Sequence, residues 1–213
     1  MKCDKKFMRL YAVTDRAWST EKKLITQLEE ALKGGVTCVQ LREKQLSTED
    51  FLIEAFEIKA LCKAYRVPFF INDNVEVAIK CGADGIHVGQ HDMKASDVRQ
   101  KIGEHMMLGV SAQTVEQAVE AEKNGADCIG VGTMFATSTK LDAETVSYEM
   151  LKAICEAVTI PVVAIGGISQ DNIFKLSGTG VDGVAIVSAI FSSKDIEKEC
   201  KLLRKLSDEM VMR

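Results

Sequence analysis

The sequence predicts an α/β fold in which eight parallel strands close into a single (β/α)8 barrel. Short β-branched runs alternate with longer segments of helical periodicity along the whole chain, which predicts a parallel sheet covered by helices. Eight such runs in 213 residues predict a closed TIM barrel near the lower end of its usual size. The runs are Leu10–Thr14, Cys38–Arg42, Phe69–Asn72, Gly85–Val88, Leu108–Ser111, Cys128–Val131, Val162–Ile165 and Gly183–Val187.

An internal repeat supports closure. The stretches GADGIHV from Gly82, GADCIGV from Gly125 and GVDGVAI from Gly180 lead into the fourth, sixth and eighth strands, and a weaker copy, GVTCVQL, starts at Gly35. We expect each glycine to end a helix in the left-handed conformation and each Asp or Thr to begin a strand. A repeat of two βα units is typical of a barrel. An open doubly wound sheet is less favoured, because neither a Gly-x-Gly-x-x-Gly nor a Walker motif is present.

Composition favours one domain over residues 1–213 and excludes several classes of function. The chain is 46% hydrophobic, has no linker-like tract, and places its two prolines, Pro68 and Pro161, just before strands. A net charge of −4 without a basic run makes nucleic acid an unexpected partner. The apolar runs are too short to span a membrane, and no signal-peptide core follows Met1. Seven scattered cysteines disfavour disulfides and structural zinc, so we expect a cytoplasmic protein.

The loop after the sixth strand has the composition of an anion site. Residues 132–140 end in Thr137, Ser138, Thr139 and Lys140, which combine hydroxyls, backbone N–H groups and one cation. Such a loop suits a phosphate or a pyrophosphate. A merely solvated polar loop is the alternative.

Reactive residues of a barrel lie at the carboxyl ends of its strands. After the second strand, Gln40, Arg42 and Lys44 share one face and Leu41 points to the other, which indicates ligand contact. The alternative is a surface ion pair that involves Glu43.

Two carboxylates follow the third and fourth strands. Asp73 and Asp92 could together hold a hard cation such as Mg2+. The alternative is that each caps a helix, Asp73 with Glu76 as its capping-box partner. The two roles are compatible in a loop of this kind.

The remaining polar residues complete the candidate site. Thr114 with Gln117 forms a capping box, which leaves Ser111 free to face the site as a hydrogen-bond donor. No zinc-hydrolase or nucleophile-elbow motif is present, so His87 is interpreted as a core residue. The glycine pair 166–167 and Val187 with Ser188 follow strands seven and eight, the usual phosphate site of a barrel.

At these positions the chain resembles the thiamine phosphate synthase family. The matching stretches span nearly the whole chain in the family's order, with Ser147 as a departure where members often carry glycine. They are QLREK from Gln40, IND from Ile71, GADGIHVGQ from Gly82 with Asp92, GVS from Gly109, GVG from Gly130, TSTK from Thr137, VAIGGI from Val163 and VSAI from Val187.

The resemblance implies roles for these residues. An aminopyrimidine diphosphate would be bound by Gln40, Leu41, Arg42, Glu43, Lys44, Asn72, Ser111 and Lys140. Asp73 and Asp92 would bind Mg2+. The thiazole phosphate would be held by Thr137, Ser138, Thr139, Gly167, Val187 and Ser188.

The implied reaction joins hydroxymethylpyrimidine diphosphate to hydroxyethylthiazole phosphate, or to its carboxylated form, and releases pyrophosphate. Pyrophosphate can leave before the thiazole nitrogen attacks, so no catalytic base is required. Arg42, Ser111 and Lys140 would stabilise the leaving group. Two alternatives remain open: a thiazole tautomerase-like paralogue, and a non-catalytic module that binds thiamine phosphate. Small-molecule substrates and possibly a second copy of the chain are the expected partners.

Overall fold

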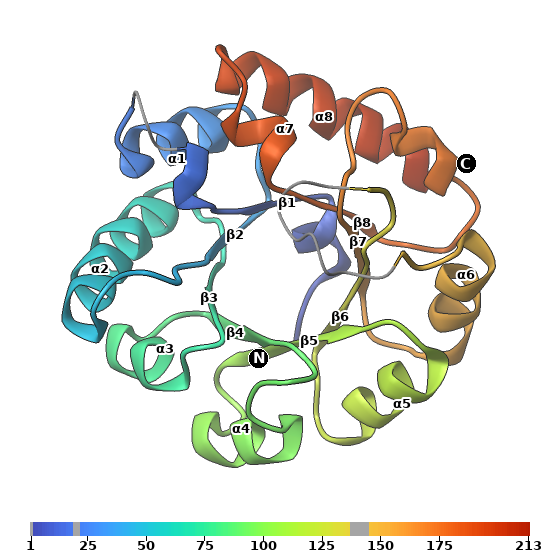
Figure 1. The fold of residues 1–213 in the computed structure, drawn as a ribbon, viewed down its shortest axis with the longest axis horizontal. Coiled ribbons are helices and arrows are strands. Elements are labelled where there is room, and N and C mark those ends of the chain that lie inside the picture. The colour runs from blue at the N-terminus through green and yellow to red at the C-terminus, as the bar shows by residue number, and fades with distance from the viewer. Residues whose placement is uncertain (1, 19–21, 137–144) are drawn as a thin grey trace.

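The strands close into a barrel in which each pairs in parallel with the next and the last with the first, as predicted (Figure 1). The computed structural model describes residues 2–18, 22–136 and 145–213. The strands are β1 (Leu10–Val13), β2 (Cys38–Leu41), β3 (Phe69–Asn72), β4 (Gly85–Val88), β5 (Met107–Ala112), β6 (Cys128–Val131), β7 (Val162–Ile165) and β8 (Gly183–Ile186). Every predicted run overlaps one of them, and the differences are confined to strand ends; β5 is one residue longer at each end than the predicted run Leu108–Ser111.

Helices form the outer ring. They are α1 (Leu24–Lys33), α2 (Thr48–Tyr65), α3 (Val75–Cys81), α4 (Ala95–Ile102), α5 (Val115–Lys123), α6 (Tyr148–Ala157), α7 (Ser188–Phe191) and α8 (Ile196–Val211). Three 3-10 helices, η1 (Lys5–Met8), η2 (Arg16–Trp18) and η3 (Ile173–Leu176), complete the described elements, and η3 stands where an α-helix would follow β7. No described helix is long and apolar enough to cross a membrane.

The amino-terminal end of the barrel is closed. Tyr11, Phe70, Met107 and Cys128 are buried in one cluster inside the barrel, and Met8 of η1 joins it from below. All seven cysteines are free, and five are buried, as expected of small core residues. The carboxyl end of the barrel is therefore left for ligand.

The sequence repeat secures the same closed end. In each copy the side-chain oxygen of the residue just before an even strand accepts a backbone N–H from the start of the preceding odd strand, the first residue of β1, β3 and β7 and the second of β5. The bonds run from Leu10 to Thr37 Oγ1 (2.9 Å), from Phe69 to Asp84 Oδ2 (2.9 Å), from Leu108 to Asp127 Oδ2 (2.8 Å) and from Val162 to Asp182 Oδ2 (3.0 Å). The glycines at 82, 125 and 180 have the predicted positive φ, at 64°, 89° and 90°. Gly82 and Gly125 follow the ends of α3 and α5 as predicted, whereas Gly180 lies beyond η3, whose cap is Ser177. The repeat is thus a structural device that joins strands in pairs.

Candidate active site

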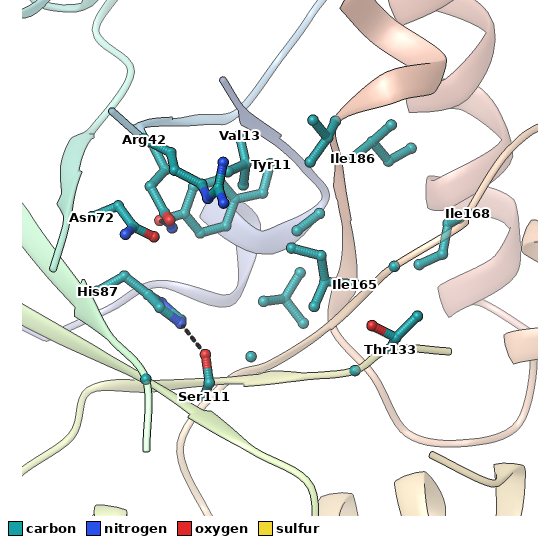
Figure 2. A pocket seen from close by; sticks show the side chains of 18 of the residues that line it. Tyr11, Val13, Arg42, Asn72, His87, Ser111, Thr133, Ile165, Ile168 and Ile186 are labelled. Atoms are coloured by element: carbon teal, nitrogen blue, oxygen red, sulfur yellow. Dashed lines mark hydrogen bonds between the residues drawn. The ribbon is translucent and has the colours of Figure 1, made fainter. Parts of the chain in front are cut away.

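A cavity of about 530 Å3 opens at the carboxyl end of the barrel and is lined from all eight strands or the loops that follow them. One wall is polar and carries Arg42, Asn72 and His87, whereas Ile165 and Ile186 belong to the apolar wall opposite (Figure 2). Tyr11 lies at the floor, where its hydroxyl accepts a hydrogen bond from Gln40 Nε2 at 3.0 Å. The cavity can therefore hold a ligand with one charged and one apolar part.

Arg42 is fixed at the rim by its own backbone and by a carboxylate. Thr14 Oγ1 accepts from Arg42 N at 2.9 Å, and the guanidinium lies 3.4 Å from Asp15 Oδ2. The alternative of a surface ion pair between Arg42 and Glu43 is wrong, because Glu43 pairs with Arg16 and Arg42 with Asp15. Arg42 lines the cavity, and among the described residues its guanidinium donates only to Asp15, which leaves other donors to bind an anion.

Glu43 shapes the loop between β2 and α2. Its carboxylate accepts from Arg16 Nε at 2.6 Å and from the N–H groups of Lys44 (2.7 Å) and Gln45 (2.8 Å). Burial opposes ionisation, but these hydrogen bonds outweigh it and lower the pKa of Glu43. Arg16 also reaches Glu54 on α2 at 2.8 Å. With 2% of its side chain exposed, Glu43 organises the loop and is not presented to the cavity.

Leu41 faces away from the cavity. Its side chain is completely buried in the layer between barrel and helices, so it can reach a ligand only through its backbone. This placement follows from the alternation that puts Gln40 and Arg42 on the other face.

Asp73 and Asp92 are not helix caps, so that alternative is wrong. Asn74 caps α3 by accepting from Val77 N, and α4 begins after Lys94 with no side-chain cap. Asp92 Oδ2 instead accepts from Gly89 N at 2.8 Å, and Asp73 Oδ2 lies 2.5 Å from Lys44 Nζ.

The two carboxylates lie close enough to interact. Burial raises the pKa of Asp73, Lys44 opposes this, and the neighbouring Asp92 raises it further. Asp73 also adopts φ of 60°, a left-handed conformation that is uncommon outside glycine. Such local strain beside a pair of like charges is typical of a functional site.

Lys44 and Asp73 lie in a hollow of about 520 Å3 beside the cavity, and Asn72 lines both spaces. Asn72 therefore connects the acidic pair to the polar wall.

Ser111 faces the cavity, as predicted, and His87 is beside it. His87 Nε2 lies 3.0 Å from Ser111 Oγ (Figure 2). His87 is buried, as expected of a core residue, but its hydrogen bonding is not complete, because its Nδ1 has no partner within the described part of the chain, and the ring lines the cavity. Burial lowers the pKa of His87 to about 4, and Asp92 opposes this only in part.

Several lining residues were missed in the sequence. They are Tyr11, Gln90, His91, Gln113 and Thr133. Gln90 Nε2 donates to Ser111 O at 2.6 Å, which ties the loop after β4 to β5. Tyr11 could have been found, because Tyr11 and Val13 alternate in a strand and share the inward face.

The apolar wall ends in the turns after β7 and β8. Gly167 has φ of 66°, and a Cβ there would lie 2.6 Å from Phe135 O, so only glycine fits. No bond to the N–H groups of Gly167 and Ser188 is present among the described residues. Gly167, Val187 and Ser188 line the cavity together, as the phosphate-site prediction requires. Thr137, Ser138, Thr139 and Lys140 lie outside the described residues.

Comparison with known proteins identifies the family. The family model for thiamine monophosphate synthase matches residues 10–190. The chain belongs to the thiamine monophosphate synthase family. A thiamine-phosphate synthase from Ruminiclostridium cellulolyticum is 50% identical over 92% of this chain and 94% of the relative. One from Clostridium acetobutylicum is 47% identical over 92% of each chain.

A solved structure agrees with these relatives. Thiamine phosphate pyrophosphorylase from Pyrococcus furiosus superposes with a TM-score of 0.89 at 38% identity, over 97% of this chain and 98% of that one. The predicted family, the barrel and the assignment as a transferase enzyme of thiamine phosphate synthesis are thereby confirmed.

Proposed function

We propose that this member of the thiamine monophosphate synthase family joins hydroxymethylpyrimidine diphosphate to hydroxyethylthiazole phosphate, or its carboxylated form, with release of pyrophosphate. The observation that carries the proposal is the division of one cavity into a polar wall beside an acidic pair and an apolar wall that ends in two amides, those of Gly167 and Ser188, with no acceptor among the described residues. The polar wall with its acidic pair suits a diphosphate and a cation, and the apolar wall with its amides suits a ring that carries a phosphate.

The diphosphate is assigned to the side of β2, β3 and β5. Arg42 lines the rim with a guanidinium that pairs with Asp15 through one nitrogen only, and Asn72 joins the cavity to the hollow that contains Lys44. The family resemblance adds Lys140. Charges held in place before the reaction stabilise a departing anion without reorganisation, which makes Arg42, Ser111 and Lys140 the proposed catalytic residues.

The residues present fit Mg2+. Asp73 and Asp92 provide hard oxygen ligands, and the Lys44 ammonium already lies against Asp73 as a cation. The described ranges contain no group of three or more acidic, His or Cys side chains that could hold a metal, so the protein ligands proposed here are this pair alone. Two carboxylates with water and substrate phosphates are a usual set for Mg2+. When bound, the ion would neutralise charge on the diphosphate.

The bond to be broken needs no base from the protein. The electron-rich aminopyrimidine can support positive charge on its methylene carbon while the C–O bond to the diphosphate breaks. The thiazole nitrogen then attacks with its own lone pair and carries no proton to remove. A neutral His87 in the polar wall suits this chemistry, because a positive charge there would disfavour a carbocation.

The thiazole phosphate is assigned to the apolar wall. Ile165 and Ile168 offer contact area to the ring, and the amides of Gly167 and Ser188 offer hydrogen bonds to the phosphate. Five buried free thiols support a reducing compartment, and we place the protein in the cytoplasm.

Two other functions predict a different result. A tautomerase-like paralogue would move a proton on the thiazole and has no use for the acidic pair. A sensor module would bind thiamine phosphate without turnover.

Purified protein is therefore incubated with both substrates and MgCl2, and thiamine phosphate and pyrophosphate are measured against an EDTA control. Equimolar, Mg2+-dependent products support the proposal, whereas thiazole phosphate binding without product contradicts it.

A further inference from the structure

The loops that follow the neighbouring strands β1 and β2 are joined by two ion pairs. Asp15 and Arg16 follow β1, and Arg42 and Glu43 follow β2. Asp15 Oδ2 lies 3.4 Å from Arg42 Nη1, and Glu43 Oε2 accepts from Arg16 Nε at 2.6 Å. Each loop therefore provides one acid and one base to the other. We name these four residues the β1–β2 clasp.

Arg16 also connects the clasp to α2. Its Nη2 donates to both carboxylate oxygens of Glu54, at 3.0 Å and 2.8 Å. Among the described residues, the only ion pairs of Glu43 and Glu54 are those with Arg16. The planar guanidinium can donate in two directions at once, which a lysine ammonium on its flexible stem does not match. One side chain thus holds the β1 loop, the β2 loop and α2 together.

Glu43 links Arg16 to the backbone of Lys44. Its second oxygen, Oε1, accepts from the N–H groups of Lys44 at 2.7 Å and Gln45 at 2.8 Å. Hydrogen bonds to a carboxylate are strong, so the group that Arg16 holds in turn fixes the backbone from which the Lys44 side chain starts. Lys44 Nζ then lies 2.5 Å from Asp73 Oδ2 in the hollow beside the cavity.

Arg16 stands behind this series and not at its end. In the described part of the chain it lines neither the cavity nor the hollow, whereas Arg42 lines the first and Lys44 the second. Figure 2 shows Arg42 on the polar wall near Asn72, the residue that lines both spaces. The two cations of the diphosphate side are therefore held by residues that do not themselves face a ligand.

We propose that Arg16 is a positioning residue for diphosphate binding, which acts through Glu43 on Lys44. The inference rests on the function proposed above, because that function assigns the diphosphate to this side of the cavity. Charged groups that are fixed before the ligand arrives lose little freedom on binding, and a small displacement of them lowers affinity. If Arg16 only stabilised the fold, its removal would lower Tm and leave the affinity for a diphosphate unchanged.

Titration calorimetry with inorganic pyrophosphate in excess MgCl2 tests the proposal without turnover. Arg16→Gln leaves Glu43 without its counter-charge and releases Lys44, so the Kd for pyrophosphate rises at least about 10-fold. Arg16→Lys keeps the charge but loses the second direction of donation, and it recovers part of the affinity. Adding Glu43→Gln to Arg16→Gln weakens binding no further, because the two residues act in one series.

Arg99→Gln is the matched control. Arg99 is another arginine that joins loops, since its Nη2 donates to Asp127 Oδ2 at 2.5 Å and to Gly125 O at 2.7 Å, but it does so at the closed end of the barrel. Its removal lowers Tm and leaves the Kd for pyrophosphate at the wild-type value. Thermal melts of all variants set a titration temperature at which each is folded.

Steady-state kinetics separate this inference from the proposed function. In Arg16→Gln the KM for the pyrimidine diphosphate rises, while the KM for the thiazole phosphate does not. A wild type that binds pyrophosphate but forms no thiamine phosphate contradicts the function alone, and the calorimetry still decides the role of Arg16. A wild type that does not bind pyrophosphate, or an Arg16→Gln variant that binds it as tightly as the wild type, overturns the inference.

Discussion

His87 Nε2 and Ser111 Oγ lie 3.0 Å apart, while His87 Nδ1 is buried without a partner among the described residues. A buried N–H without an acceptor is rarer and more costly than a buried lone pair without a donor. The favoured tautomer therefore carries its proton on Nε2 and donates it to Ser111. The Ser111 hydroxyl proton is then directed elsewhere, and the cavity is where a ligand oxygen can accept it.

His87→Phe removes this donor and keeps a ring of similar size. If His87 is a positioning residue for Ser111, kcat falls about tenfold and KM changes little, because the bond orients a donor used in the transition state. His87→Gln can still donate to Ser111 and recovers part of the loss. Steady-state kinetics of both variants provide the measurement. Equal losses in the two variants would argue for a packing role only.

The depressed pKa of His87 predicts how stability depends on pH. The folded protein holds the imidazole neutral down to about 4, whereas the unfolded chain protonates it near 6.5. The unfolded state therefore binds more protons in this interval, and stability falls as pH drops from 6.5 towards 4. Urea unfolding at several pH values shows this as a slope that His87→Phe reduces. An unchanged slope in the variant would assign the effect to other groups.

The sequence predicts the strands and the repeat because their signals are local. Each Asp or Thr of the repeat bonds across one strand pair at a fixed place in a βα unit. The role of His87 depends on distant residues instead. A Cβ at Gly109 would lie 2.4 Å from His87 Nδ1, so the ring fits only because the next strand has glycine there. That register is known only after the barrel closes.

The acidic pair is a second part of the site that could not be predicted from the sequence alone. Asp73 and Asn74 are adjacent and both are good capping residues, so propensity alone does not say which one caps α3. In the structure Asn74 caps, and Asp73 is left to face Asp92.

Lys140→Ala is expected to lower turnover by at least about 10²–10³, the usual effect of removing a donor to a developing anion. The fold should be unchanged, since the predicted role is in the loop after β6. Single-turnover kinetics under saturating substrates and a thermal melt measure the two effects. Unchanged turnover in a well-folded variant removes Lys140 from the mechanism.

Asp84→Ala tests the device at the closed end of the barrel. The substitution leaves the buried N–H of Phe69 without its acceptor, which costs about 1–3 kcal/mol. A loss of this size lowers Tm by about 2–4 °C per kcal/mol in a chain of this length. Asp84→Asn keeps an acceptor oxygen and costs less. Because Asp84 is at the opposite end from the cavity, kcat below Tm should stay at the wild-type value, and a large loss of kcat would contradict this separation.

Asp73→Asn separates the repulsion within the acidic pair, which lowers stability, from the proposed role of the pair in binding Mg2+. Since the pKa of Asp73 is raised in the folded state, stability is lost as pH rises through that pKa, and the ionised pair destabilises the fold near neutral pH. Asn removes the repulsion and tolerates the left-handed φ of 60°. Without Mg2+ the variant should therefore melt at or above the wild-type temperature.

With MgCl2 the wild type should have the higher melting temperature of the two proteins. A ligand that binds only the folded state raises Tm by mass action, so the wild type gains stability, whereas the variant, with one carboxylate fewer, gains little. Melting curves with and without MgCl2 at neutral pH give both comparisons without any turnover. Asn74→Ala is the control, because it removes the cap of α3 one residue away, lowers Tm in both conditions and keeps the Mg2+ shift. An equal Mg2+ shift in wild type and Asp73→Asn would show that the ion binds elsewhere.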